Sequence, residues 1–136
     1  MNEDKHAGNV ILLRVACLTL LIALVLAWCL VFSIPMKIPF FLEIFKKTDK
    51  LLSAHLDFLM MTMLLLGFYA AKIRLPKYVL WPMAIGSIGN PTAFILNSVF
   101  PDSTSPLIGL FIFTTITLTT VGYGLAAIKV MRYSLK

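Results

Sequence analysis

The feature that most limits the fold of this chain is a series of four long apolar runs separated by short polar segments. The runs cover residues 9–35, 51–71, 78–100 and 107–130. A helix needs about 20 mostly apolar residues to cross the hydrocarbon core of a bilayer, and each run reaches that length. Only 13% of the residues are charged, which is about half the share in an ordinary soluble domain. The sequence therefore predicts one integral-membrane domain over residues 1–136, an all-α bundle of four transmembrane helices.

The first run also has to be weighed against a signal peptide. Its apolar part is longer than the apolar region of a usual signal peptide. Trp28 stands where a lipoprotein cleavage site would need a small residue. We therefore interpret residues 9–35 as a transmembrane helix.

The basic residues indicate the orientation of the bundle. The net charge is +6, but the Lys and Arg residues lie at the ends of the apolar runs, which argues against a nucleic-acid partner. Eight of the twelve belong to the N-terminal head, the segment between the second and third runs, or the tail. The positive-inside rule then predicts cytoplasmic termini. We expect a multi-pass protein of the cell (inner) membrane, with the lipid bilayer as its surroundings.

Residues 39–47 differ from the long runs because charged and apolar side chains alternate there. Four apolar residues are interleaved with Glu43, Lys46 and Lys47. This spacing is typical of a short amphipathic helix that lies in the membrane interface, where it could cover a site at the surface. A loop that merely rests on the lipid would have the same composition.

Two ionisable residues, His55 and Asp57, lie near the start of the second run. An ionisable group inside a spanning helix is costly and is a functional candidate by default. Two positions along a helix differ by about 200°, so the two side chains point to different sides. Asp57 shares its face with Met61, whereas His55 shares its face with Leu59 and Thr62. Such a helix is either central in its bundle or contributes to a site shared between protomers.

The third run carries a stripe of residues that share one helix face: Gly86, Asn90, Phe94 and Asn97. An Asn side chain in hydrocarbon is costly unless it is hydrogen-bonded. Two of them on one face indicate a helix–helix contact or the wall of a pocket. On the same run, Gly89 has a small residue four positions later, a spacing that permits close approach of another helix.

Metal binding by protein groups alone is disfavoured by the composition of the runs. His55 is their one histidine, and His6 lies in the polar head. The sequence contains no CxxC or HExxH motif and no Gly-rich phosphate loop. A single axial histidine is nevertheless sufficient for haem, because the porphyrin supplies the other four donors.

The second and third runs resemble a known group of membrane enzymes. Residues 53–57 (SAHLD) followed by 60–63 (MMTM) are similar to the second-helix signature of hydroxylaminobenzene mutase and, more distantly, of styrene oxide isomerase. Residues 86–90 (GSIGN) align with a Gly…Asn segment of the third helix of these proteins. Both are small four-helix membrane isomerases, and the likeness covers about residues 51–100.

The resemblance implies a homotrimer of four-helix protomers that binds haem b. In styrene oxide isomerase the ferric iron acts as a Lewis acid and not as a redox centre. The implied reaction is rearrangement of a small hydrophobic substrate, either an aryl epoxide to an aldehyde or an aryl hydroxylamine to an aminophenol. On this basis we assign His55 as the iron ligand. The resemblance also implies catalytic roles for Asn90 and Asp57. Further contacts to the cofactor are assigned to Met61, Phe94 and Asn97.

Two departures from the pattern bear on the reaction. The family has an Asn six residues after the His, where this chain has Met61. The isomerase has a Tyr four residues after the third-helix Asn, where this chain has Phe94. Haem binding through His55 survives these changes, whereas epoxide isomerisation loses a donor and a hydroxyl. Two alternatives therefore stay open: a haem-binding carrier, sensor or electron-transfer subunit, and a small four-helix transporter that uses Asp57.

Overall fold

The computed structural model describes residues 9–136, and this part of the chain is helical without strands. It contains five helices, which are α1 (Val10–Ser33), α2 (Pro39–Ile44), α3 (Thr48–Ala70), α4 (Lys77–Val99) and α5 (Pro106–Ser134). The four long helices are each long and apolar enough to cross a membrane. The predicted all-α architecture with four long apolar helices is therefore confirmed.

The observed helices overlie the four apolar runs, with small differences at their ends. α3 begins at Thr48, before the apolar run starts, and α5 continues past Val130 to Ser134. Arg132 lies in the last turn of α5, where a cation interacts favourably with the free carbonyl groups of a helix end. In the predicted interfacial stretch, α2 has Pro39 in its first turn and ends at Ile44. The position of α2 in a membrane interface stays a prediction.

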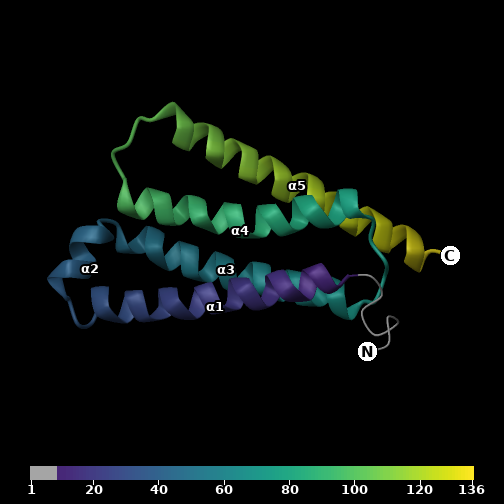
Figure 1. Cartoon of the computed structure of the whole chain (residues 1–136), viewed down its shortest axis with the longest axis horizontal. Helices are drawn as coiled ribbons and strands as arrows, with labels where there is room; N and C mark the ends of the chain where they lie inside the picture. The colour runs from purple at the N-terminus through teal and green to yellow at the C-terminus, as the bar shows by residue number, and fades with distance from the viewer. Residues whose placement is uncertain (1–8) are drawn as a thin grey trace.

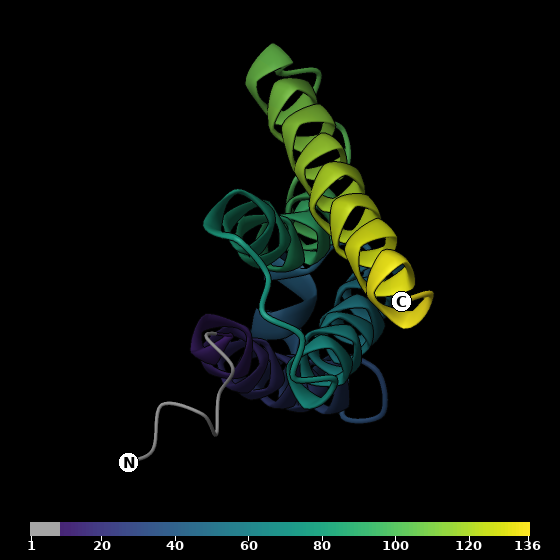
Figure 2. The ribbon, with the colours of Figure 1, turned by 90° about the vertical axis from the view of Figure 1, so that its right-hand side faces the viewer.

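The long helices run antiparallel to their neighbours (Figure 1). α3 contacts α1 on one side and α4 on the other, so it is central in the bundle. α5 packs on α4 and crosses the other helices at an angle (Figure 2). Three residues of α5 are buried, namely Thr115, Gly122 and Ala126. Most of the α5 surface is thus left to the surrounding lipid, to a partner or to a ligand.

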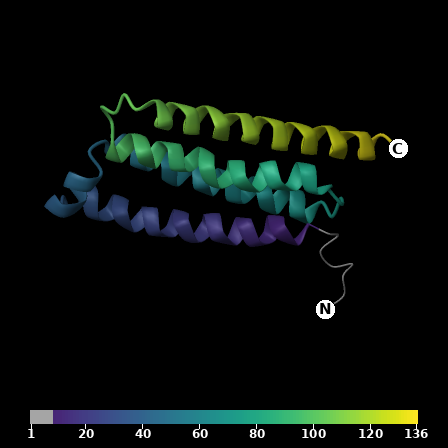
Figure 3. The same ribbon diagram turned by 45° about the horizontal axis from the view of Figure 1, so that its top comes forward.

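The two ends of the bundle differ in charge. The start of α1, the α3–α4 connection and the end of α5 lie together at one end, and α2 and the α4–α5 connection lie at the other (Figure 3). The first end, hereafter the basic end, carries seven basic residues: Arg14, Lys72, Arg74, Lys77, Lys129, Arg132 and Lys136. Within residues 9–136 no Asp or Glu lies at this end.

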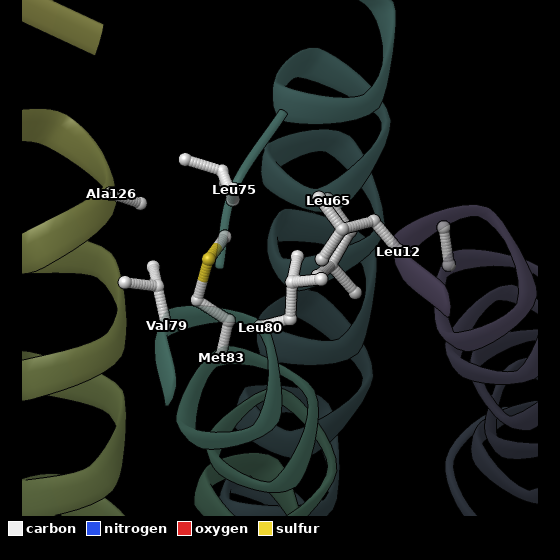
Figure 4. Packing of buried hydrophobic residues seen from close by; sticks show 8 residues of the cluster. Leu12, Leu65, Leu75, Val79, Leu80, Met83 and Ala126 are labelled. Atoms are coloured by element: carbon white, nitrogen blue, oxygen red, sulfur yellow. The ribbon is translucent and has the colours of Figure 1, made fainter. Parts of the chain in front are cut away.

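Two apolar clusters form the core. At the basic end all four long helices contribute, with Leu12 from α1, Leu65 from α3, Val79 and Met83 from α4, and Ala126 from α5 (Figure 4). The second cluster lies in the other half of the bundle, and its buried residues come from α1 and α3: Ala23, Leu26, Leu30, Leu51, Ala54 and Phe58. All four long helices therefore meet in the core at the basic end, whereas the core cluster in the other half is built mainly by α1 and α3.

Glycines allow α4 and α5 to approach closely. A Cβ atom on Gly89 would lie 2.5 Å from the Thr115 side chain, and a Cβ atom on Gly122 would lie 2.5 Å from the Met83 backbone nitrogen. Both distances are far below an ordinary van der Waals contact. The close helix approach predicted at Gly89 is confirmed, and its partner is α5.

Polar side chains tie the ends of the bundle together. The fully buried Asn9 amide donates to the Ile73 carbonyl, and its Oδ1 accepts a hydrogen bond from the Leu75 N–H at 3.1 Å. These bonds join the start of α1 to the α3–α4 connection. At the other end, the Ser98 hydroxyl donates to the Lys47 carbonyl at 2.7 Å, which joins α4 to the start of α3.

Candidate functional site

A polar layer crosses the bundle at about half its length, between the two apolar clusters. Each pair of successive long helices is joined there by one hydrogen bond between side chains. The pairs are Thr19–Thr62 between α1 and α3 (2.7 Å), Asn90–Asp57 between α3 and α4 (2.9 Å), and Ser87–Tyr123 between α4 and α5 (2.5 Å). Because isolated polar groups are costly in hydrocarbon, this pairing fixes the relative register of all four helices.

Asp57 and Asn90 form the one pair in this layer that includes a carboxyl group. The Asn90 Nδ2–H group donates to Asp57 Oδ2, and the Asp57 side chain is 8% exposed. The bond offsets part of the cost of burying the carboxyl group. For Asn90, the helix–helix contact that the sequence analysis considered is therefore present.

Asn90 also lines an open groove between α3 and α5, hereafter the α3–α5 groove. Its volume is about 410 Å³, and its wall includes Met60, Met61, Thr119, Thr120 and Tyr123. The groove exists because α5 packs on α4 and leaves the neighbouring face of α3 uncovered. A mostly apolar cavity of this size with a few polar groups is typical of a site for a small ligand.

A smaller pocket of about 250 Å³ adjoins this groove at Met60. Asp57 and Phe94 line it, together with Ser53 and Leu56. Phe94 is half-buried and also packs against the core cluster of α1 and α3. Four of the residues singled out from the sequence, Asp57, Met61, Asn90 and Phe94, therefore gather on one side of α3.

His55 lies on a different side of α3, as the helical spacing requires. Its Nδ1–H group donates to the Ala23 carbonyl of α1 at 2.8 Å. The ring is half-buried, and within residues 9–136 its Nε2 atom has no hydrogen-bond partner. A metal-bound histidine characteristically donates its other ring N–H to a carbonyl or carboxylate, which fixes the tautomer and the ring orientation. In this arrangement His55 could hold a haem iron through Nε2.

The structure does not bring all the predicted site residues together. Within one protomer, His55 faces α1 while Asp57 and Asn90 face one another between α3 and α4. Asn97 is half-buried and lies seven residues beyond Asn90, which is roughly 10 Å along the helix axis. No hydrogen bond of the Asn97 side chain is found in the described part of the chain. The pocket wall proposed for Asn97 is thus not continuous with the α3–α5 groove.

One residue that the sequence analysis did not single out, Tyr123, belongs both to the polar layer and to the wall of the groove. Tyr123 lines the α3–α5 groove, and its hydroxyl is hydrogen-bonded to Ser87 of α4. A Tyr in the middle of an apolar run needs a partner for its hydroxyl, which is a signal that the sequence contains. Which residue provides that partner depends on how α5 crosses α4.

The helices and their polar layer define the class of the protein, a multi-pass membrane protein with four candidate spans. No protein-family model matches the chain, and neither a curated protein nor a solved structure matches it.

Proposed function

We propose that this protein is a membrane-embedded haem b-dependent isomerase that rearranges a small hydrophobic substrate. The observation that carries the proposal is the hydrogen bond from His55 Nδ1–H to the Ala23 carbonyl, which leaves Nε2 available to a metal. The sequence resemblance around His55 and Asn90 supports the same conclusion. A ferric haem bound at His55 would supply a Lewis acid that polarises a carbon–oxygen or nitrogen–oxygen bond of the substrate.

The residues on the other side of α3 are suited to bind and orient the substrate. Asn90 is held by Asp57 and still has one amide hydrogen and its carbonyl oxygen for a further contact. The side chains of Met60 and Met61 give the α3–α5 groove an apolar, adaptable wall. This wall would exclude water from a small aromatic substrate while Asn90 fixes its polar end.

Tyr123 is positioned to supply the hydroxyl group that the chain lacks at Phe94. It lines the α3–α5 groove from α5, and Asn90 lines the same groove from α4. Its hydroxyl interacts with Ser87, which fixes the direction of the phenol group. We therefore add Tyr123 to the groups that hold the substrate oxygen, in place of the family's third-helix Tyr.

The two faces of α3 favour a site shared between protomers. His55 and the Asp57–Asn90 pair cannot face the same cavity within one chain, because they lie on different sides of α3. In a homo-oligomer, the His55 side of one protomer can approach the α3–α5 groove of the next. We propose a homotrimer on this basis and from the resemblance.

A haem-binding protein without isomerase activity is the second candidate. The observation that favours it is the hydrogen bond from Asn90 to Asp57, because the two polar side chains then serve to join α3 and α4 and not to bind a substrate. Met61 and Phe94 also offer no hydrogen-bond donor to a substrate. Activity measurements distinguish this candidate from the isomerase, whereas haem binding does not.

Haem binding is tested by the absorbance spectrum of the detergent-purified protein after supply of haem. We expect a Soret band in the parent, no band in His55→Ala, and an unchanged band in His6→Ala, which removes the other histidine. Added imidazole should restore haem binding to His55→Ala, which a merely misfolded variant would not show. A parent protein that takes up no haem would overturn the proposal and favour the transporter that uses Asp57.

The isomerase reaction is tested with a panel of aryl epoxides and aryl hydroxylamines, without added reductant or oxidant. We expect aldehyde or aminophenol products from the haem-loaded parent. Tyr123→Phe should lower kcat while the Soret band changes little, and the loss of its bond to Ser87 should lower the thermal stability of the bundle modestly, as for the other bonds of the polar layer. Unchanged substrate across the panel, with haem present, would reject the isomerase and leave the non-enzymatic haem protein.

We further propose that the basic end of the bundle faces the cytoplasm of the cell (inner) membrane. Its seven described cations lie beside both the start of α1 and the end of α5. Fusions at Lys136 test this orientation. A C-terminal fluorescent protein should fluoresce, and a C-terminal alkaline phosphatase should stay inactive; the reverse pattern would invert the topology.

A further inference from the structure

Cations at the basic end are concentrated beyond what membrane topology alone requires. Within residues 9–136 this end has seven basic and no acidic residues, whereas Glu43, Asp49 and Asp102 balance four lysines at the opposite end. The positive-inside rule accounts for the number of cations on one side. It does not account for their arrangement around a cavity.

Two adjoining cavities lie at the basic end. The larger, of about 610 Å³, lies between α1, α4 and the end of α5 and has a mostly apolar wall that includes Ile11, Leu80 and Trp81. The smaller, of about 280 Å³, is lined by Ile73 and Tyr133 and by four cations: Arg74, Lys129, Arg132 and Lys136. Arg74 and Lys129 line both cavities, so the apolar cavity adjoins the basic one at these two side chains.

The four cations converge because the α3–α4 connection ends beside the last turns of α5. Lys129 Nζ lies 5.4 Å from the centre of the Tyr78 ring, and this cation–π contact holds the ammonium group at the border between the cavities. In the part of the chain that the structure describes, none of the four forms an ion pair. Like charges at one cavity repel one another, so a bound anion would relieve that repulsion.

The apolar cavity has the features of a lipid-facing groove at headgroup depth. Tyr78 and Trp81 are 62% and 53% exposed, and both lie in the first turns of α4. Aromatic residues with an apolar body and a polar edge are enriched at this depth of a membrane. The core residues Leu75 and Leu80 line the cavity, so its inner wall belongs to the apolar core shared by the four long helices.

We propose that these two cavities bind one anionic phospholipid of the leaflet at the basic end. Its phosphate lies among Arg74, Lys129, Arg132 and Lys136, and the start of an acyl chain follows the apolar cavity past Trp81. Basic pockets between transmembrane helices recognise anionic headgroups through this combination of charge and apolar surface. A free phosphate ion would use the basic cavity alone and would leave the larger apolar cavity without a role.

Trp81 provides a direct reporter for this site. In a Trp28→Phe protein, Trp81 is the remaining tryptophan. The protein is reconstituted into phosphatidylcholine vesicles that contain equal mole fractions of either brominated phosphatidylglycerol or brominated phosphatidylcholine, and quenching of Trp81 is measured. Each cation near an anionic headgroup contributes roughly fivefold to affinity. We expect at least about tenfold stronger association of the anionic quencher, and equal quenching by the two lipids would overturn the proposal.

Charge variants separate the site from general surface charge. In the double variant Arg74→Gln/Lys129→Gln, brominated phosphatidylglycerol should quench Trp81 about as weakly as brominated phosphatidylcholine does. The matched pair Lys46→Gln/Lys50→Gln, at the opposite end, should keep it. A preference that survives the first pair, or is lost equally in both, would refute a built site.

Two further measurements use the Trp28→Phe protein with all its cations in place, so a folding defect of a charge variant cannot affect them. High salt should weaken the anionic preference, because the contact is electrostatic and partly exposed. Inorganic phosphate at constant ionic strength should leave it unchanged. A preference insensitive to salt would overturn the proposal, and displacement of the lipid by phosphate would replace it with a site for a free phosphate ion.

Discussion

Substitution of Gly122 by Ala tests the packing of α5, on which the α3–α5 groove depends. The added Cβ atom would lie 2.5 Å from the Met83 backbone nitrogen and 2.8 Å from the Pro82 carbonyl carbon. These are backbone atoms of α4, which cannot rotate away as the end of a flexible side chain can. The methyl group can therefore be accommodated only if the two helices move apart.

The size of the effect follows from the contact distances. An ordinary van der Waals contact begins at 3.4 Å, so α5 has to move away from Met83 by roughly 1 Å. Overpacking of this kind costs about 1–3 kcal/mol. Replacing Gly by Ala inside a helix returns about 0.5–1 kcal/mol. We expect Gly122→Ala to lower the free energy of unfolding by about 1–2 kcal/mol.

Gly124→Ala is the matched control for this substitution. Gly124 is in the same helix two residues later, and a Cβ atom there would have no other atom within 4 Å. It should therefore be neutral or slightly stabilising. Thermal unfolding in detergent, followed by circular dichroism, measures both variants. If Gly122→Ala is as stable as Gly124→Ala, then α5 does not pack on α4 as closely as the structure has it, and the groove beside it loses its basis.

Three further substitutions test the hydrogen bonds that join the helices. Asn90→Ala leaves its carboxyl partner on α3 without a bond and should cost about 1–3 kcal/mol of stability in detergent, whereas Asn97→Ala should cost little. Thr62→Val removes the bond to α1 and should cost about 0.6–1.7 kcal/mol, while the exposed Thr114→Val serves as its control. Asn9→Ala removes the two hydrogen bonds that hold the α3–α4 connection, so trypsin should cleave this basic connection several times faster than in the parent. An unchanged cleavage rate would contradict the bonds of Asn9.

The sequence alone determined the secondary structure and the number of long helices. The physical reason is that hydrocarbon leaves no water to bond the backbone, so a run of about 20 apolar residues has to be helical. The apolar pattern does not determine the ends of the helices: α3 starts at Thr48 and α5 ends at Ser134, both outside the apolar runs. The separation of His55 from Asp57 also followed from the sequence, since it depends only on the 3.6-residue period of one helix.

Only the tertiary structure decided which helix each of these side chains faces. Asp57 could have met any neighbour, and its bond to Asn90 depends on the central place of α3 between α1 and α4. The α3–α5 groove depends on how α5 crosses α4, and so does the position of Tyr123 in its wall. This crossing is set by close contacts at Gly89 and Gly122. A periodic pattern fixes the faces of a single helix, but the pairing of faces depends on shape complementarity between helices far apart in the chain.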